Sequence, residues 1–127
     1  MNSTQSAKNE GEAILDRSSL HSYRTELPNI ILAIGLDVYE KALYLEYKKV
    51  AGDGGICWKS TQSLVDSLKI SKNKFYETKK KLAEPRSELE GLSLISIKPR
   101  YKEGASQRLT DLIVITDLWP LNFKKCF

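Results

Sequence analysis

The sequence lacks any long hydrophobic run. No apolar segment approaches the roughly 20 residues needed to span a bilayer, and the opening residues 1–8 have no apolar centre of the kind found in signal peptides. We therefore expect a cytoplasmic protein that has no membrane partner.

Residues that hold metal ions are also scarce. The chain contains one histidine and two cysteines, and His21 is far along the sequence from both Cys57 and Cys126. Zinc sites usually combine four Cys or His ligands at short spacings, so we expect no metal. Thiols of cytosolic proteins normally stay reduced. We therefore predict that Cys57 is a small buried hydrophobic residue and that Cys126 belongs to the tail.

Catalytic signatures are missing as well. The sequence has no glycine-rich phosphate loop, no paired carboxylates and no arrangement of His, Cys and Asp that suggests nucleophilic catalysis. We expect a protein that is not an enzyme, with no catalytic residue and no cofactor.

What the chain does have is enough apolar sequence for one core. Its 127 residues are 41% hydrophobic, which fits a single domain. Residues 1–25 are polar and have few large apolar side chains, so we expect a flexible leader. Residues 26–118 form the expected domain, and residues 119–127 the tail.

Basic charge is concentrated in the middle of the chain. Residues 1–58 carry 6 basic and 8 acidic side chains, residues 59–102 carry 11 and 5, and residues 103–127 carry 3 and 3. The net charges of the three segments are therefore −2, +6 and 0. A local basic surplus suits a polyanionic partner; the alternative interpretation is a solvated, lysine-rich helix face.

Helical periodicity first appears at residues 38–50. Val38, Ala42 and Leu45 lie on one helical row, with Leu43 and Tyr47 on the next. This wide stripe predicts a core helix in which the tyrosines pack and the charged side chains, Glu40 among them, lie mainly off the stripe. A glycine-rich turn follows, and then residues 56–58 as a short edge strand.

Two helix starts lie only eleven residues apart. Ser60 is expected to cap a short helix, and Ser71 a second one that runs to about Ala83, before Pro85 limits it. The ranges 89–97 and 109–116 read as two strands of a hairpin with a basic tip at 98–108.

The helix after Ser71 has two different sides. Phe75, Thr78 and Leu82 share one side, which should pack against apolar residues of the preceding helix and turn. The partners expected there are Leu64, Val65, Leu68 and Ile70. The opposite side carries Asn73, Tyr76, Glu77 and Lys80, with Lys72, Lys74, Lys79 and Lys81 on its flanks.

Such a helix fits the major groove of DNA. Asn73 can pair with adenine, Glu77 can accept from cytosine, and Lys72 or Lys74 can donate to guanine or phosphate. Lys79, Lys80 and Lys81 are expected to meet phosphates, and the hairpin tip would add a minor-groove or backbone contact. The candidate DNA-binding residues are Lys59, Thr61, Lys72, Asn73, Lys74, Tyr76, Glu77, Lys80, Lys81, Arg100, Lys102 and Arg108.

The combination of elements over residues 27–117 resembles a known family. Leu27-Pro28-Asn29, Ala42-Leu43-Tyr44-Leu45, Ile56-Cys57-Trp58-Lys59-Ser60, Ile70-Ser71 and Gly91-Leu92-Ser93-Leu94-Ile95 are similar to the winged helix-turn-helix domains of bacterial plasmid and phage proteins, which include replication initiators and small regulators. The resemblance implies an α+β fold with a three-helix core, a short strand and a C-terminal β-hairpin wing. The chain departs from the family at residues 84–88, which lengthen the connection to the wing.

The function implied is sequence-specific binding of double-stranded DNA, as a transcriptional regulator of a bacterium or mobile element. The helix at about 71–83 would enter the major groove, and the wing at 98–108 would contact the backbone or minor groove. Two alternatives stay open: a plasmid or phage replication accessory or initiator module, and a winged-helix protein-interaction module. A homodimer or another protein partner could extend the DNA site. Residues 117–123 would serve such pairing or pack back on the core.

Overall fold

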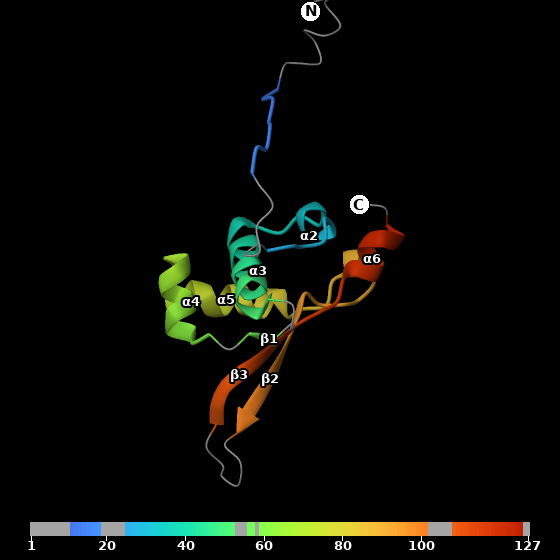
Figure 1. Cartoon of the computed structure of the whole chain (residues 1–127). Helices are drawn as coiled ribbons and strands as arrows, with labels where there is room; N and C mark the ends of the chain where they lie inside the picture. Colours follow the sequence, from blue (N-terminus) through green and yellow to red (C-terminus); the bar gives the residue numbers. More distant parts are fainter. Residues whose placement is uncertain (1–10, 19–24, 53–55, 58, 102–107, 126–127) are drawn as a thin grey trace, which may run out of the picture.

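The computed structural model describes residues 11–18, 25–52, 56–57, 59–101 and 108–125, and its fold is α+β. In chain order the elements are α2 (Ile30–Ala33), α3 (Val38–Ala51), β1 (Ile56–Cys57), α4 (Thr61–Leu68), α5 (Lys72–Leu82), the 3-10 helix η2 (Ser87–Leu89), β2 (Ile95–Tyr101), β3 (Arg108–Ile115) and α6 (Trp119–Lys124) (Figure 1). Residues 11–18 are exposed and contain no helix or strand.

The strands form a small antiparallel sheet in the order β1-β3-β2. β1 is a short edge strand, as predicted, and pairs Ile56 with Val114. β2 and β3 form the predicted hairpin, whose register shifts between Lys98 and Arg100. Pro99 lies at this shift and has no amide proton for the ladder, which accounts for the irregularity.

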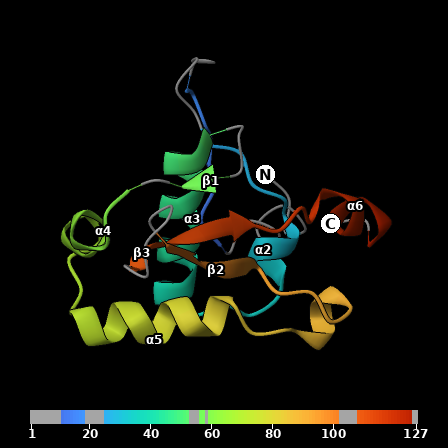
Figure 2. The ribbon, with the colours of Figure 1, turned by 90° about the horizontal axis from the view of Figure 1, so that it is seen from below.

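The core lies between the sheet and the helices α3, α4 and α5, and α2 and α6 add Ile30, Ile31 and Leu121 to it. α3 and α5 cross each other (Figure 2). Tyr44 and Tyr47 of α3 and Phe75 of α5 are its largest side chains, each no more than 1% exposed. Two of the three α3 tyrosines, Tyr44 and Tyr47, therefore pack in the core, as predicted. Burial raises the pKa of Tyr44 to about 12 because the phenolate would lose its hydration.

The buried face of α3 is rotated from the predicted stripe. Val38 is 78% exposed and Leu45 39% exposed, so these two assignments were wrong. The buried row is Glu40, Leu43, Tyr44 and Tyr47, which follows the i, i+3, i+4, i+7 spacing of one helix face.

Glu40 is buried because its carboxylate has two polar partners. One oxygen accepts from the backbone N–H of Asp37 at 3.3 Å, and the Asp37 side chain accepts from the Glu40 N–H at 2.8 Å. The other oxygen accepts a hydrogen bond from Arg86, which follows α5. These donors replace the hydrogen bonds to water that the carboxylate loses on burial.

The first hairpin strand starts later than expected. Leu89 ends the η2 turn, and Glu90 and Gly91 have φ values of 56° and 86°, which an extended strand does not allow. The strand begins at Ile95 and continues through Tyr101. The Leu94 N–H donates to the Leu82 carbonyl at 3.1 Å, so the longer connection at 84–88 closes on itself and returns the chain to the end of α5.

The tail packs back on the domain, which is one of the two outcomes expected for it. Leu118 and Leu121 are buried, and the Asn122 side chain accepts from the Ile30 N–H at 2.9 Å. Trp119 and Phe123 stay exposed, at 46% and 87%. Cys126 and the Cys57 side chain lie outside the described residues, so the predictions for both thiols stay predictions. Within the described ranges, no helix has the length and apolar character that crossing a membrane requires.

Candidate nucleic-acid interface

Two serine caps set the start of α4 and of α5, as predicted. The Ser60 hydroxyl accepts from the Ser63 N–H, and the Ser71 hydroxyl from the Lys74 N–H, each at 3.1 Å. Between the two helices, Lys69 adopts a left-handed conformation with φ 55° and its N–H donates to the Val65 carbonyl. This residue ends α4 and lets the chain turn sharply into α5.

The buried side of α5 is also the predicted one. Phe75, Thr78 and Leu82 are each no more than 1% exposed. The Thr78 hydroxyl donates to the Lys74 carbonyl at 2.7 Å, so its polar group is satisfied within the helix.

The element against which α5 lies differs from the prediction in part. α5 crosses α3 and contacts it (Figure 2), while α4 contributes Leu64 and Val65 to the same core. Leu68 and Ile70 are only partly buried. The orientation of α5 therefore depends on α3 as well as on the helix before it.

The opposite side of α5 faces solvent. Lys72, Asn73, Tyr76, Glu77 and Lys80 are all exposed, and Tyr76 is 53% exposed. No described residue pairs with the Lys72 or Lys80 ammonium or accepts a hydrogen bond from the Asn73 amide. These three side chains present unused donors to whatever approaches α5.

One flank of α5 forms a charge network with the start of α3. The Glu77 carboxylate lies 3.8 Å from the Lys74 ammonium and 3.5 Å from that of Lys81, and Lys81 also lies 3.7 Å from Asp37. Lys74 stands over the Tyr39 ring at 4.3 Å. The hydrogen bond from the Glu40 N–H, and then the charges of the two lysines, hold the pKa of Asp37 below its ordinary value.

Tyr39 is a residue that sequence reasoning missed. It was assigned to core packing with the other tyrosines of its helix, but it is 44% exposed and adjoins the candidate interface. No sequence signal distinguished it, because the row that is buried includes Glu40, whose partner Arg86 lies far along the chain.

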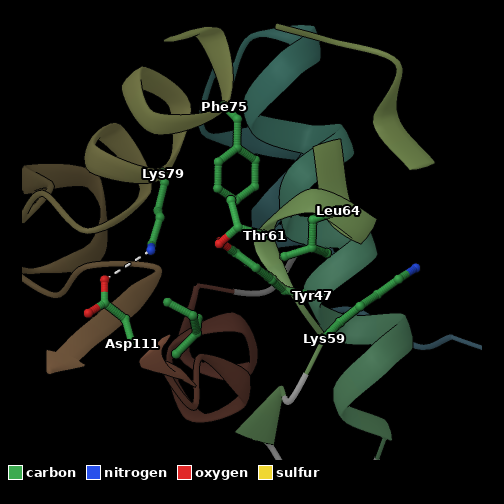
Figure 3. Close-up of a pocket in the computed structure, with 8 residues that line it drawn as sticks. Tyr47, Lys59, Thr61, Leu64, Phe75, Lys79 and Asp111 are labelled. Atoms are coloured by element: carbon green, nitrogen blue, oxygen red, sulfur yellow. Dashed lines mark hydrogen bonds and ion pairs between the residues drawn. The ribbon is translucent and has the colours of Figure 1, made fainter. Parts of the chain in front are cut away.

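One lysine of the basic segment points into the fold. The Lys79 ammonium binds Asp111 of β3 at 3.1 Å, and the two side chains are only 12% and 18% exposed. This pair borders a small cavity of about 20 Å³ that Phe75, Thr61 and Leu64 also line (Figure 3). The charge of Lys79 is already used to tie α5 to the sheet, which argues against the predicted phosphate contact.

Lys59 and Thr61 lie at the start of α4, beside that cavity. Lys59 binds Glu46 and the Ser67 hydroxyl, each at 3.0 Å, and is 30% exposed. Thr61 is half-buried. Both were predicted as DNA contacts. Lys59 is engaged within the chain, and Thr61 lines the cavity.

The predicted hairpin tip is partly strand. Lys98 and Arg100 belong to β2, and Arg108 begins β3 opposite Tyr101. The ladder therefore extends into the range assigned to the tip, because pairing resumes after Pro99. Arg100 is half-buried and has interactions within the chain. Lys102 lies outside the described residues.

A metal centre finds no support in the described part of the chain, where no three His, Cys, Asp or Glu side chains gather as ligands. Comparisons with protein-family models, with curated proteins and with solved structures yield no match to this sequence. The function of this chain is therefore inferred from the geometry of α5 and its neighbours.

Proposed function

We propose that this protein is a winged helix-turn-helix protein that binds double-stranded DNA sequence-specifically. In this proposal α4, the turn at Lys69 and α5 form the helix-turn-helix, with α5 in the major groove. The β2–β3 hairpin is the wing. The order helix, short strand, helix, turn, helix, hairpin supports this assignment.

The observation that carries the proposal is the exposed side of α5. It combines two lysines and an asparagine whose donors are unused within the described chain, on a helix whose other side is fully buried. An α-helix fits the major groove, where base edges are read by such side chains. Burial of Phe75 and Leu82 would hold these donors in place when DNA approaches.

The exposed residues divide into base-reading and backbone-binding groups. Asn73 lies in the first turn and would pair with adenine, while Lys72 would donate to guanine or a nearby phosphate. Lys80 lies two turns further and would meet the backbone, which adds affinity for any sequence. Tyr76 lies between these two positions and would contact the groove wall.

Lys74, Lys81 and Glu77 would act differently, because they are already paired with one another and with Asp37. A phosphate can recruit either lysine only by displacing a carboxylate. Base reading by Glu77 would likewise require it to leave its lysines. We therefore rank this flank below Lys72, Asn73 and Lys80.

The cellular role that we propose is transcriptional regulation in a bacterium or mobile element, on the basis of the resemblance to small winged-helix regulators. A replication accessory factor would use the same DNA-binding surface and would differ in where its sites occur. Mapping selected sequences to promoters or to replication origins distinguishes the two roles.

The decisive experiment is selection of bound duplexes from a random pool, followed by single substitutions. Asn73→Ala should relax the preference at one base position by about 1–3 kcal/mol. Lys80→Ala should weaken all duplexes alike and reduce the salt slope by about 0.9. Two exposed residues far from the interface in sequence, Asn29 and Lys49, provide matched controls when changed to alanine.

Absence of duplex binding at low salt would refute the proposal and favour a protein-interaction module. Loss of base preference in the Lys80 variant, with uniform weakening in the Asn73 variant, would reverse the assigned roles. Equal effects of Lys49→Ala and Lys80→Ala would show that only net charge matters.

A further inference from the structure

An ion pair joins α5 to the hairpin. The Lys79 ammonium lies 3.1 Å from the Asp111 carboxylate, and the two side chains are only 12% and 18% exposed. They point toward each other beside the small cavity that Phe75 also lines (Figure 3). Water and salt screen a shielded pair less than an exposed one. The pair is therefore a defined link between two residues that are 32 positions apart in the chain.

A bulge in β3 accompanies this link. Between the residue pairs that flank Pro99, β3 has one residue more than β2, so Thr110 and Asp111 together lie opposite this one proline. Two residues opposite one form a β-bulge, which bends its strand and redirects the side chains at that point. Pro99 favours the bulge because it has no amide proton for the ladder. Asp111 thus leaves β3 where the direction of the hairpin changes.

The hairpin extends beyond the helices (Figure 1). Its base belongs to the core, where Ile95 and Ile113 are buried. Asp111 lies two residues further toward the tip than Ile113, at a place where β3 and α5 both line the cavity. Apolar packing therefore holds the base of the hairpin, and the ion pair holds the part that leaves the core.

A duplex sets the distance between its major groove and the neighbouring backbone. In the proposed function α5 occupies the groove, while the hairpin contacts the backbone or the minor groove. Both contacts form at little cost when the protein already holds the two elements at the matching distance, because fewer groups lose freedom on binding. Non-specific binding through scattered phosphate contacts does not require this fixed distance. A link between α5 and the outer hairpin therefore acts mainly on affinity for the specific site.

We propose that Lys79 and Asp111 are positioning residues for DNA binding. Their ion pair fixes the hairpin relative to α5, so that both elements contact one duplex at the same time. This role rests on the proposed function, and it belongs to two residues that touch no DNA themselves. Lys79 differs in this respect from Lys80, its exposed neighbour on α5.

The test removes the link without changing the net charge. Lys79→Ala combined with Asp111→Ala deletes both partners, so neither charge is left buried and unpaired. Fluorescence anisotropy then measures affinity for the selected duplex and for a random duplex. The double-alanine variant should bind the selected duplex about fivefold more weakly or worse. Its affinity for the random duplex should stay within about twofold of the wild type, because the exposed lysines of α5 remain.

The ratio of the two affinities separates positioning from other roles. A merely structural role would lower both affinities by the same factor, because less protein would be folded. A direct phosphate contact by Lys79 would also weaken random-duplex binding and reduce the salt slope by about 0.9. Either result would overturn the positioning role. Lys79→Arg keeps a cation opposite Asp111 and should preserve the ratio.

Lys124 and Glu90 provide a matched control. They form an ion pair at 2.9 Å whose side chains are 68% and 48% exposed, and they lie on α6 and just after η2, outside the candidate interface. Lys124→Ala combined with Glu90→Ala removes the same two charges and should leave both affinities unchanged. Circular dichroism verifies the fold of each variant. If the double-alanine variant does not fold, Lys79→Met with Asp111→Leu fills the space with contacts of no fixed direction and should lower the same ratio.

The position of the hairpin is also measured without DNA. Residual dipolar couplings of backbone amides report the orientation of each element. In the wild type and in the Lys124 and Glu90 control, the amides of α5, β2 and β3 should fit one alignment tensor. In the double-alanine variant, the hairpin should require a tensor of its own.

Two further results would overturn the positioning role. One is a double-alanine variant whose couplings still fit a single tensor, and the other is an unchanged ratio of selected to random affinity. A wild type that binds no duplex at low salt would instead refute the proposed function, whatever the couplings show.

Discussion

Glu77→Gln is the most informative single change at the candidate interface. Its carboxylate lies 3.8 Å from the Lys74 ammonium and 3.5 Å from that of Lys81, so it competes with DNA phosphate for both lysines. Glutamine keeps the shape and hydrogen-bonding capacity but removes the charge. If Glu77 restrains the lysines, the variant should bind duplex DNA more tightly than the wild type.

The size of the effect follows from exposure. Glu77 is 56% exposed in both pairs, and the two lysine side chains are 29% and 40% exposed, so each pair contributes only about 0.2–1 kcal/mol. Removing both competing pairs should therefore strengthen non-specific binding by about 0.4–2 kcal/mol, or roughly 2- to 30-fold at low salt. Lys74 would become available to phosphates, and Lys81 would keep only Asp37 as a partner, so the salt slope would increase by about 0.9 to 1.8.

Fluorescence anisotropy with a random duplex at several salt concentrations measures both quantities. Glu84→Gln serves as the control, since it makes the same charge change at an exposed position just beyond α5 for which no described residue supplies an ion pair. Equal gains in DNA affinity in the two variants would show that the effect comes from net charge alone. Unchanged random-duplex binding, combined with a lost preference at one base position, would instead show that Glu77 reads a cytosine directly.

Three further predictions concern stability and are checked by urea unfolding. Ser71→Ala should lower the unfolding free energy by about 1 kcal/mol, because α5 loses its cap. The control Ser96→Ala on β2 should change the unfolding free energy little. Equal losses in the two variants would show that the Ser71 cap does not stabilise α5. Lys79→Ala should destabilise the protein by about 1–3 kcal/mol, since its ion pair to β3 is largely shielded from solvent, while Lys80→Ala should cost under about 0.5 kcal/mol. Asp37 has a depressed pKa in the fold, so its contribution is present above the unfolded pKa of about 3.9 and is lost as the pH falls through the lower folded value. Asp37→Asn should flatten the acid limb of the stability curve, and an unchanged acid limb would contradict this assignment.

Prediction succeeded where structure depends on neighbours along the chain. A serine followed by helical spacing caps a helix wherever the helix packs, so both starts at Ser60 and Ser71 were predictable. The burial of Phe75, Thr78 and Leu82 follows from a period of 3.6 residues. Two apolar runs separated by a polar, glycine-containing segment likewise predicted the hairpin.

Prediction failed where contacts with residues far along the chain determine which side chains are buried. Glu40 was predicted to face solvent with the other charged side chains, but it is buried because Arg86, 46 residues later, donates a hydrogen bond to it. The strand at 89–97 was shortened because Glu90 and Gly91 turn the chain through positive φ values. Neither the partner nor the turn leaves a periodic signal in the sequence.

Lys79 and Lys80 show the division most directly. They are identical neighbours in the sequence, which by itself determined that a capped helix with one apolar side would carry them among other lysines. Only the tertiary structure decided that Lys79 meets Asp111 on β3, while Lys80 faces solvent. The periodicity of a helix defines the angles between its side chains. Packing against elements distant in the chain sets the rotation of the helix, and this rotation decides which charged side chains stay free to bind a partner.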